Sequence, residues 1–256
     1  MNTAIVIGVG PDRGLGAQLC RRFAGLGLRV FVAGRTRESL DAVVANIEAD
    51  GGVAEAVVTD ATDEGQVASL FDAAGDGLTL VVYNVGNNTP GRIADMEAGY
   101  FEAAWRTGCF GGFLVGREAV RRFLAGNSVS SGDDGTGNGG AATGTRGTLL
   151  FTGASASLRG RANFGAFNSA KGALRNLAQA MAKEYGPEGV HVGHVVIDGG
   201  IAGEKIFRRV PELAESSGGG RLISLEGIVD GYVHLYRQPP TAWTFELDLR
   251  TSVENW

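Results

Sequence analysis

The chain of 256 residues is poor in the residues that build crosslinked or metal-dependent folds. Its two cysteines, Cys20 and Cys109, fall in separate predicted helices, so a disulfide framework is excluded and a reducing compartment is expected. The three histidines have no cysteine or carboxylate at ligand spacing, which argues against a metal site. A chain of this length can bury a stabilising core without either kind of crosslink.

Long apolar runs and an excess of positive charge are also missing. No run approaches the length of a membrane span, and no basic, apolar leader opens the sequence. The formal net charge of −5 argues against nucleic acid or an anionic membrane as the main partner. We therefore expect a cytoplasmic protein that acts on a small-molecule substrate.

What the sequence does contain is a clear nucleotide-binding pattern at its start. Residues 3–7 are apolar and predict a buried strand, and a glycine-rich turn follows from Gly8 to Gly16. Leu15, Leu19 and Phe23 then recur at helical spacing. Such a strand, turn and helix form the first half of a βαβ unit, in which turn glycines let backbone N–H groups approach a pyrophosphate.

The same alternation continues along the chain. Strands are expected over 3–7, 29–34, 54–59, 78–83, 149–152, 190–197 and 243–249. After the helix that begins at Leu15, further helices are expected over 39–49, 64–74, 100–124, 164–185 and 225–237. Apolar strands that alternate with helices predict an α/β fold of the Rossmann type, with a doubly wound, seven-stranded, mostly parallel sheet and helices on both faces. We expect one such domain over 1–256.

One segment interrupts this alternation. Residues 126–147 are rich in Gly, Ser, Thr and Asp, and they show no apolar periodicity. This composition predicts a flexible surface insertion, with a regulatory or partner-binding loop as the alternative.

The spacing Gly10-x-x-x-Gly14-x-Gly16, together with its position, resembles that of the short-chain dehydrogenase/reductase family. The resemblance extends over nearly the whole chain. It implies a nicotinamide dinucleotide bound by the turn, by the ends of the third, fourth and sixth strands, and by a lysine. In this sequence these residues are Gly10, Gly14, Leu15, Gly16, Asp60, Ala61, Asn84, Val85, Gly86, Lys171, Gly199 and Ile201.

The end of the second strand points to the form of the coenzyme. An acid there would bind a ribose 2′-hydroxyl, but this chain has Arg35, and an arginine suits a 2′-phosphate. Arg13, inside the glycine turn, is also placed to face that phosphate. The two arginines favour NADP(H), with NAD(H) as the alternative.

The catalytic residues depart from the family pattern. The family's Tyr-x-x-x-Lys becomes Phe167-Asn168-Ser169-Ala170-Lys171, and a phenylalanine cannot exchange a proton. The family's serine aligns with Ala154, next to Ser155, and its helix asparagine aligns with Gly108. Lys171 is therefore the clear survivor of the tetrad, and Ser155 is a second catalytic candidate.

Two functions follow from this altered tetrad. The first is an NADP(H)-dependent oxidoreductase for a small carbonyl, hydroxyl or enone substrate, in which water or another side chain supplies the proton. The second is an NADP(H)-binding protein without redox turnover, such as a sensor, a partner subunit or a repurposed enzyme. The resemblance also implies a substrate lid over 203–222 and a homodimer or homotetramer that pairs through helices 100–124 and 164–185.

Overall fold

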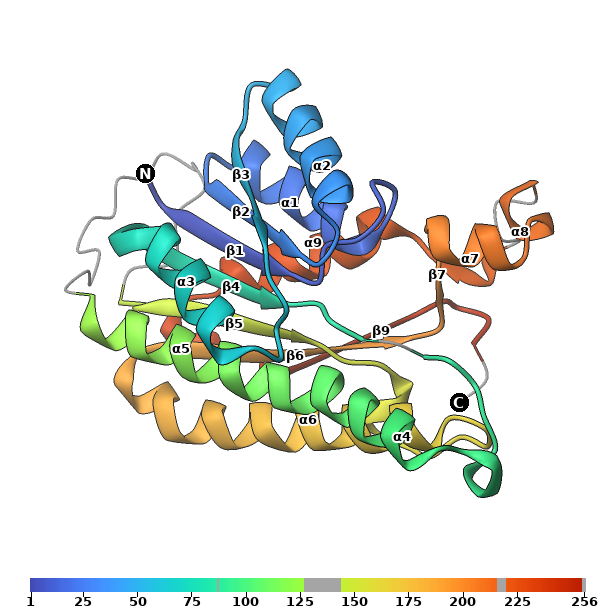
Figure 1. Ribbon diagram of the computed structural model, residues 1–256. Helices are drawn as coiled ribbons and strands as arrows, with labels where there is room; N and C mark the ends of the chain where they lie inside the picture. The colour runs from blue at the N-terminus through green and yellow to red at the C-terminus, as the bar shows by residue number, and fades with distance from the viewer. Residues whose placement is uncertain (87, 127–143, 216–219, 255–256) are drawn as a thin grey trace.

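The computed structural model describes residues 1–86, 88–126, 144–215 and 220–254 (Figure 1). Seven strands form one sheet in the order β3-β2-β1-β4-β5-β6-β9, and each neighbouring pair is parallel. They are β1 (Thr3–Ile7), β2 (Arg29–Gly34), β3 (Val53–Val58), β4 (Leu78–Tyr83), β5 (Gly147–Thr152), β6 (Val190–Asp198) and β9 (Glu246–Arg250). The predicted doubly wound fold is confirmed.

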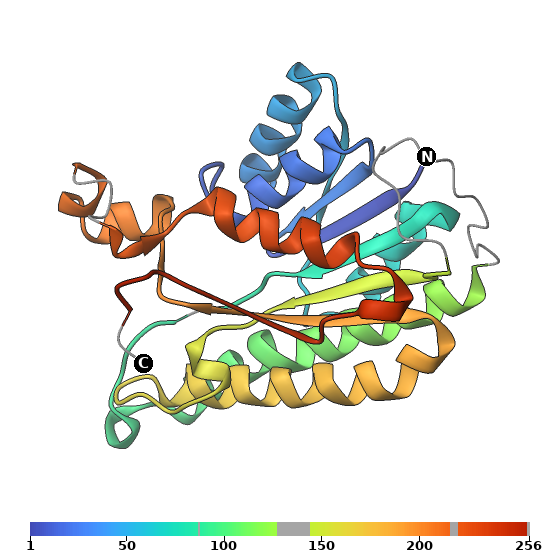
Figure 2. The same cartoon turned by 180° about the vertical axis from the view of Figure 1, so that it is seen from behind.

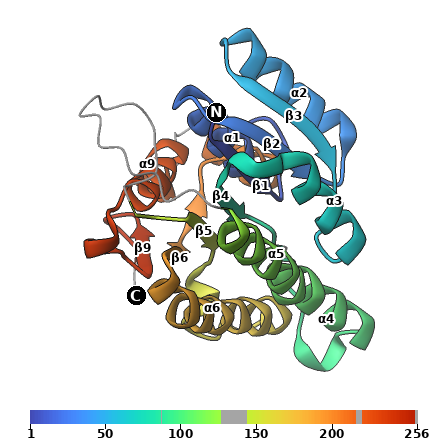
Figure 3. The same cartoon turned by 90° about the vertical axis from the view of Figure 1, so that its left-hand side faces the viewer.

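Helices cover both faces of the sheet, as the end-on view in Figure 3 shows. One face packs against α1 (Leu15–Gly25), α2 (Arg37–Ala49) and α9 (Leu225–Tyr236), and the other against α3 (Glu64–Ala74), α5 (Gly111–Ala125) and α6 (Gly165–Tyr185). Successive residues of β1 point to opposite faces, so Ala4 and Val6 enter one core while Ile5 and Ile7 enter the other. Burial on both sides explains why this strand is apolar throughout.

The helix predicted over 100–124 is not one regular helix. It consists of α4 (Ala98–Trp105), a π-helical segment (Arg106–Phe110) and α5. The buried side chain of Tyr83 reaches this segment, and its hydroxyl donates a hydrogen bond to the Thr107 carbonyl at 2.5 Å. A Cβ at Gly111 would lie 2.6 Å from that hydroxyl, so the glycine makes room for the tyrosine. π-turns of this kind occur mostly as single interruptions near functional sites.

Two further segments frame the carboxyl ends of the strands. In Figures 1 and 2, α7 (Glu204–Arg209) and α8 (Glu212–Glu215) project beyond this edge of the sheet, within the predicted lid over 203–222. In the chain they lie between the two strands of a small parallel pair, β7 (Gly200–Ile201) and β8 (Leu222–Ile223). Most of the predicted 126–147 insertion lies outside the described residues, and its flexibility and the single-domain assignment stay predictions. Among the described helices, none combines the length and apolar character that crossing a membrane requires.

Candidate functional site

A pocket of about 210 Å³ lies at the carboxyl ends of β1, β2, β3 and β4. The chain passes from β1 outward to β3 and returns to β4 on the other side of β1, so this is the point where the strand order reverses. Ligands of open parallel sheets bind at such a point. The lining residues are Ile7, Gly8, Val9, Gly10, Gly34, Arg35, Thr36, Thr59, Asp60, Ala61, Thr62, Asn84, Val85, Gly86, Thr107 and Lys205.

Three glycines shape this pocket in different ways. Gly8 has a φ of +93°, and a Cβ there would lie 2.6 Å from the Asn84 carbonyl oxygen. A Cβ at Gly34 would lie 2.5 Å from the Val9 carbonyl oxygen. These two glycines therefore let the ends of β1, β2 and β4 come together. At Gly10, by contrast, a Cβ would meet no atom of the described residues within 4 Å, so the turn presents open space toward the pocket.

Other predicted coenzyme residues support the turn rather than line the pocket. A Cβ at Gly14 would lie 2.9 Å from the Pro11 carbonyl oxygen, and one at Gly16 would lie 3.0 Å from the Val9 Cα. Leu15 is buried and begins α1. Gly199 packs against Ile223, and Ile201 pairs with the same residue through β7 and β8.

Some arginines at or near the pocket form ion pairs and others do not. Arg35 lines the pocket and is exposed, whereas Arg13 is exposed but does not line it. Among the described residues neither guanidinium forms a hydrogen bond or ion pair. Two nearby arginines differ, because Arg21 pairs with Asp12 and Arg37 pairs with Asp41 at 2.9 Å.

The acid of the pocket is Asp60. Its carboxylate accepts hydrogen bonds from the Thr62 backbone N–H at 2.9 Å and hydroxyl at 2.8 Å. The bond from the backbone N–H is the main cause that lowers the pKa of Asp60, and the charge of Arg35 adds to it. The pocket thus combines an ionised carboxylate just after β3 with an arginine just after β2, and that arginine has no close partner among the described residues.

Lys171 lies behind the Gly86 end of the pocket. Its ammonium, on α6, is 3% exposed and donates to the carbonyl oxygens of Val85 at 3.0 Å and Thr152 at 2.7 Å. Burial lowers the pKa of Lys171 to about 8. A Cβ at Gly86 would lie 3.3 Å from this nitrogen, a tight contact, so the lysine side chain packs directly against the backbone there.

The substituted tetrad positions lie around the same helix. The Phe167 ring centre is 6.0 Å from the Lys171 nitrogen, and the ring also borders Gly86. Gly108 belongs to the π-helical segment, and a Cβ there would lie 2.6 Å from the Ala170 Cβ. This contact leaves no room for an asparagine. Ala154 precedes a 3₁₀ turn that starts at the partly buried Ser155. The backbone N–H of Ala154 donates a hydrogen bond to the Ser157 hydroxyl at 3.2 Å.

An ion pair between a buried carboxylate and an exposed arginine, which the sequence analysis missed, lies at the end of β6. The Asp198 side chain is 3% exposed and accepts from the Arg159 guanidinium, 3.0 Å from each carboxylate oxygen. This pair ties the loop after Ser155 to the segment that leads into α7. No motif predicts it, because the two residues are 39 positions apart.

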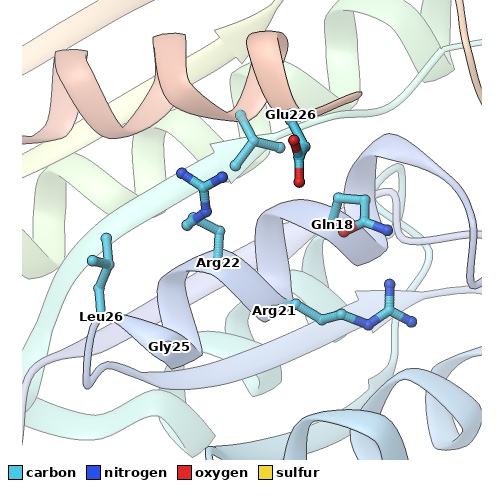
Figure 4. Close-up of a pocket in the computed structure, with 7 residues that line it drawn as sticks. Gln18, Arg21, Arg22, Gly25, Leu26 and Glu226 are labelled. Atoms are coloured by element: carbon cyan, nitrogen blue, oxygen red, sulfur yellow. The ribbon is translucent and has the colours of Figure 1, made fainter. Parts of the chain in front are cut away.

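A second pocket, of about 310 Å³, lies between α1 and α9 (Figure 4). Gln18, Arg21, Arg22 and Glu226 line it, together with Gly25, Leu26 and Val229. Arg21 pairs with Asp12 and Arg22 with Asp230, so its guanidinium groups are already neutralised. Within the described ranges no group of three or more His, Cys, Asp or Glu side chains could hold a metal ion. The pocket at the strand ends is therefore the stronger candidate.

Comparison with known proteins identifies the family. A family model described as short chain dehydrogenase matches residues 2–204. Versicolorin reductase stcU of Emericella nidulans is 26% identical over 196 residues, which is 75% of this chain and 66% of that protein. The short-chain reductase protein NovJ of Streptomyces niveus is 28% identical over 234 residues, 86% of this chain and 75% of that protein. The chain thus spans about two thirds of the length of some curated relatives.

Solved structures agree with this comparison. A short-chain dehydrogenase from Rhodopseudomonas palustris is 35% identical, with a TM-score of 0.77 and coverage of 97% of this chain and 98% of the other. An actinorhodin polyketide ketoreductase with NADPH shares the fold at a TM-score of 0.83, with 18% identity and coverage of 100% and 98%. From its fold, its glycine turn and these matches, the chain belongs to the short-chain dehydrogenase/reductase family of NAD(P)-dependent oxidoreductases.

Proposed function

We propose that this protein is an NADP(H)-dependent oxidoreductase that acts on a small carbonyl, hydroxyl or enone substrate. The observation that carries the proposal is the pocket where the strand order reverses. Gly10 leaves this pocket open, and Arg35 lines it with no close partner in the part of the chain that the structure describes. The ketoreductase with NADPH supports the same coenzyme for this fold.

The residues present fit a dinucleotide. Asp60 and Ala61 would border the adenine, Arg35 and Arg13 would hold a 2′-phosphate, and Gly10 with the start of α1 would receive the pyrophosphate. Asn84, Val85 and Gly86 line the far side, where the Lys171 ammonium would hold the nicotinamide ribose. Gly199 and Ile201 would lie beside the nicotinamide. The coenzyme supplies or accepts the hydride.

The protein's own part in the chemistry is orientation and charge. Phe167 lies beside the ammonium, with its ring centre 6.0 Å away, but it transfers no proton, so the substrate oxygen exchanges its proton with water or a neighbouring side chain. We assign Ser155 to hold that oxygen, because it directly follows Ala154, with which the family's serine aligns, and begins the 3₁₀ turn there. The absence of one positioned acid costs about 10²–10⁴-fold in rate, which slows hydride transfer without preventing it.

Consumption of NADPH tests this function. The purified protein is incubated with a panel of ketones, aldehydes, quinones and enones, and NADPH loss is matched to reduced product by mass spectrometry. Stoichiometric turnover with one class supports the oxidoreductase. Tight coenzyme binding with no turnover across the whole panel supports the non-redox alternative instead.

Phe167→Tyr by itself is expected to raise NADPH-dependent ketone reduction by less than tenfold. The new phenol would stand near the Lys171 ammonium, but Ala154 offers no hydroxyl and Gly108 no amide to complete the site. Initial rates of NADPH oxidation measure the change, with Phe164→Tyr as a control that adds a phenol elsewhere on the same loop and helix. A gain of about 10²-fold or more, as expected for a restored general acid, would contradict a site altered at several positions.

Lys171 makes coenzyme affinity depend on pH. Its pKa is lowered to about 8, so the ammonium is present at neutral pH and is lost as the pH rises. A bound dinucleotide stabilises the cation, so we expect the Kd for NADPH to increase about tenfold with a midpoint at or above pH 8. Titrations from pH 7 to 9.5 measure this, and Lys171→Met should show a flat profile. An equally steep profile in that variant would assign the effect to another group.

We also propose that the protein is a homodimer or homotetramer in the cytoplasm. Phe101, Trp105 and Phe113 are 42%, 40% and 38% exposed and form an aromatic stripe along α4 and α5. Exposed apolar surface of this kind marks association sites. The free, buried thiols of Cys20 and Cys109 fit a reducing compartment. Sedimentation velocity gives the assembly state directly.

A further inference from the structure

A lysine on α7 lines the coenzyme pocket, although no motif predicts it. Lys205 borders the same pocket as Gly8, Val9, Gly10 and Arg35. The residue is exposed, and within the described ranges it has no recorded hydrogen bond or ion pair. A cation without a close counterion therefore faces the pocket from an element that contributes nothing to the main sheet.

The position of Lys205 is fixed by backbone contacts with the glycine turn. The Glu204 N–H donates to the Arg13 carbonyl oxygen at 3.1 Å. Gly203 is buried, and a Cβ there would lie 3.1 Å from the same oxygen and 4.0 Å from the Gly14 Cα. The start of α7 thus packs against the turn itself, and Lys205 is the residue that follows this contact.

The neighbouring charges leave Lys205 available for an anion. Arg208, on the same helix, pairs with Glu204, so that carboxylate is already neutralised. Asp60, the acid that lines the pocket, accepts hydrogen bonds from Thr62, and the nearby positive charge of Arg35 helps to lower its pKa. A lysine ammonium is a compact charge on a flexible stem, which suits contact with phosphate oxygens.

We infer that Lys205 binds the pyrophosphate of the coenzyme and so couples coenzyme binding to the docking of α7 on the glycine turn. This inference rests on the proposed function. The pyrophosphate is favoured over the 2′-phosphate because α7 contacts the turn at Arg13 and Gly14, next to the start of α1. The 2′-phosphate site is assigned to Arg35 at the end of β2, a different strand.

Three ligands separate these phosphates. NADPH, NADH and adenosine 2′-monophosphate are titrated into the full-length protein and into Lys205→Met, Lys205→Arg and the control Arg209→Met. We expect Lys205→Met to weaken NADPH and NADH by the same factor, about tenfold, and to leave adenosine 2′-monophosphate unchanged. Lys205→Arg should recover most of the affinity, and Arg209→Met should match the parent. In hydrogen exchange, NADPH should slow the amides of α7 in the parent and less so in Lys205→Met.

The outcomes distinguish this inference from the proposed function. Dinucleotide affinity that is unchanged in Lys205→Met, in a parent that binds NADPH, overturns the inference alone. A loss of affinity confined to NADPH and adenosine 2′-monophosphate also overturns the inference, because Lys205 would then bind the 2′-phosphate and not the pyrophosphate. A parent that binds neither dinucleotide overturns the proposed function together with the inference.

Discussion

Arg35→Ala is expected to raise the Kd for NADPH by about 10–100-fold and to change the Kd for NADH by less than threefold. Arg35 follows β2, lines the pocket, and has no recorded ion pair among the described residues. A guanidinium can hold a phosphate through two parallel charge-assisted hydrogen bonds, and NADH has no phosphate at this place. The side chain is exposed, so water screens part of this contribution.

Arg37→Ala is the matched control for this experiment. Arg37 is two residues further along the chain, exposed, and paired with Asp41 on the same helix turn. It does not line the pocket. We expect both coenzymes to bind this variant as they bind the parent. Equal losses for NADPH and NADH in Arg35→Ala would show that Arg35 does not distinguish the phosphate.

Gly8→Ala is expected to destabilise the fold, whereas Gly10→Val is expected to weaken coenzyme binding with little effect on stability. Gly8 has a φ of +93° and would place its Cβ 2.6 Å from the Asn84 carbonyl oxygen. Strain from the left-handed backbone and from this backbone contact costs about 1–3 kcal/mol each, so Gly8→Ala should lower the free energy of unfolding by about 2–6 kcal/mol. Gly10 has no atom within 4 Å of its Cβ position, so Gly10→Val should unfold within about 2 °C of the parent.

Coenzyme affinity is the property in which Gly10→Val is expected to differ from the parent. The valine at position 10 would occupy the open side of the turn, where the proposed pyrophosphate approaches the backbone. We expect Gly10→Val to weaken NADPH and NADH alike, by at least about tenfold. Thermal unfolding and calorimetric titration of the two variants measure both effects. A Gly10→Val variant with parental affinity would place the coenzyme away from this turn.

The centre of the sheet could be predicted from sequence because its inner strands are buried on both faces. β1, β2 and β4 are mostly apolar between glycine or polar boundaries, and their predicted limits match those of the structure. The general location of the pocket follows from the same logic, because the ends of parallel strands meet at one edge of the sheet. Its residues are named from the resemblance to the short-chain dehydrogenase/reductase family. Gly10, Arg35, Asp60 and Asn84 come from four strand ends and line one pocket.

Features that depend on side-chain packing between distant segments could not be predicted. The helical pattern of residues 100–124 is regular in sequence, but Tyr83 inserts against Gly111 and bonds Thr107, where the helix becomes a π-turn. Lys205 reaches the pocket only because α7 rests on the glycine turn. Such contacts join residues far apart in the chain, and local periodicity does not encode them.

Calorimetric titration of the purified protein with NADPH tests the central claim most directly. The account predicts one NADPH per chain, with a Kd of about 1–100 μM at neutral pH and at least about tenfold weaker binding of NADH. The absence of heat and of any thermal shift at millimolar concentrations of both coenzymes would contradict it.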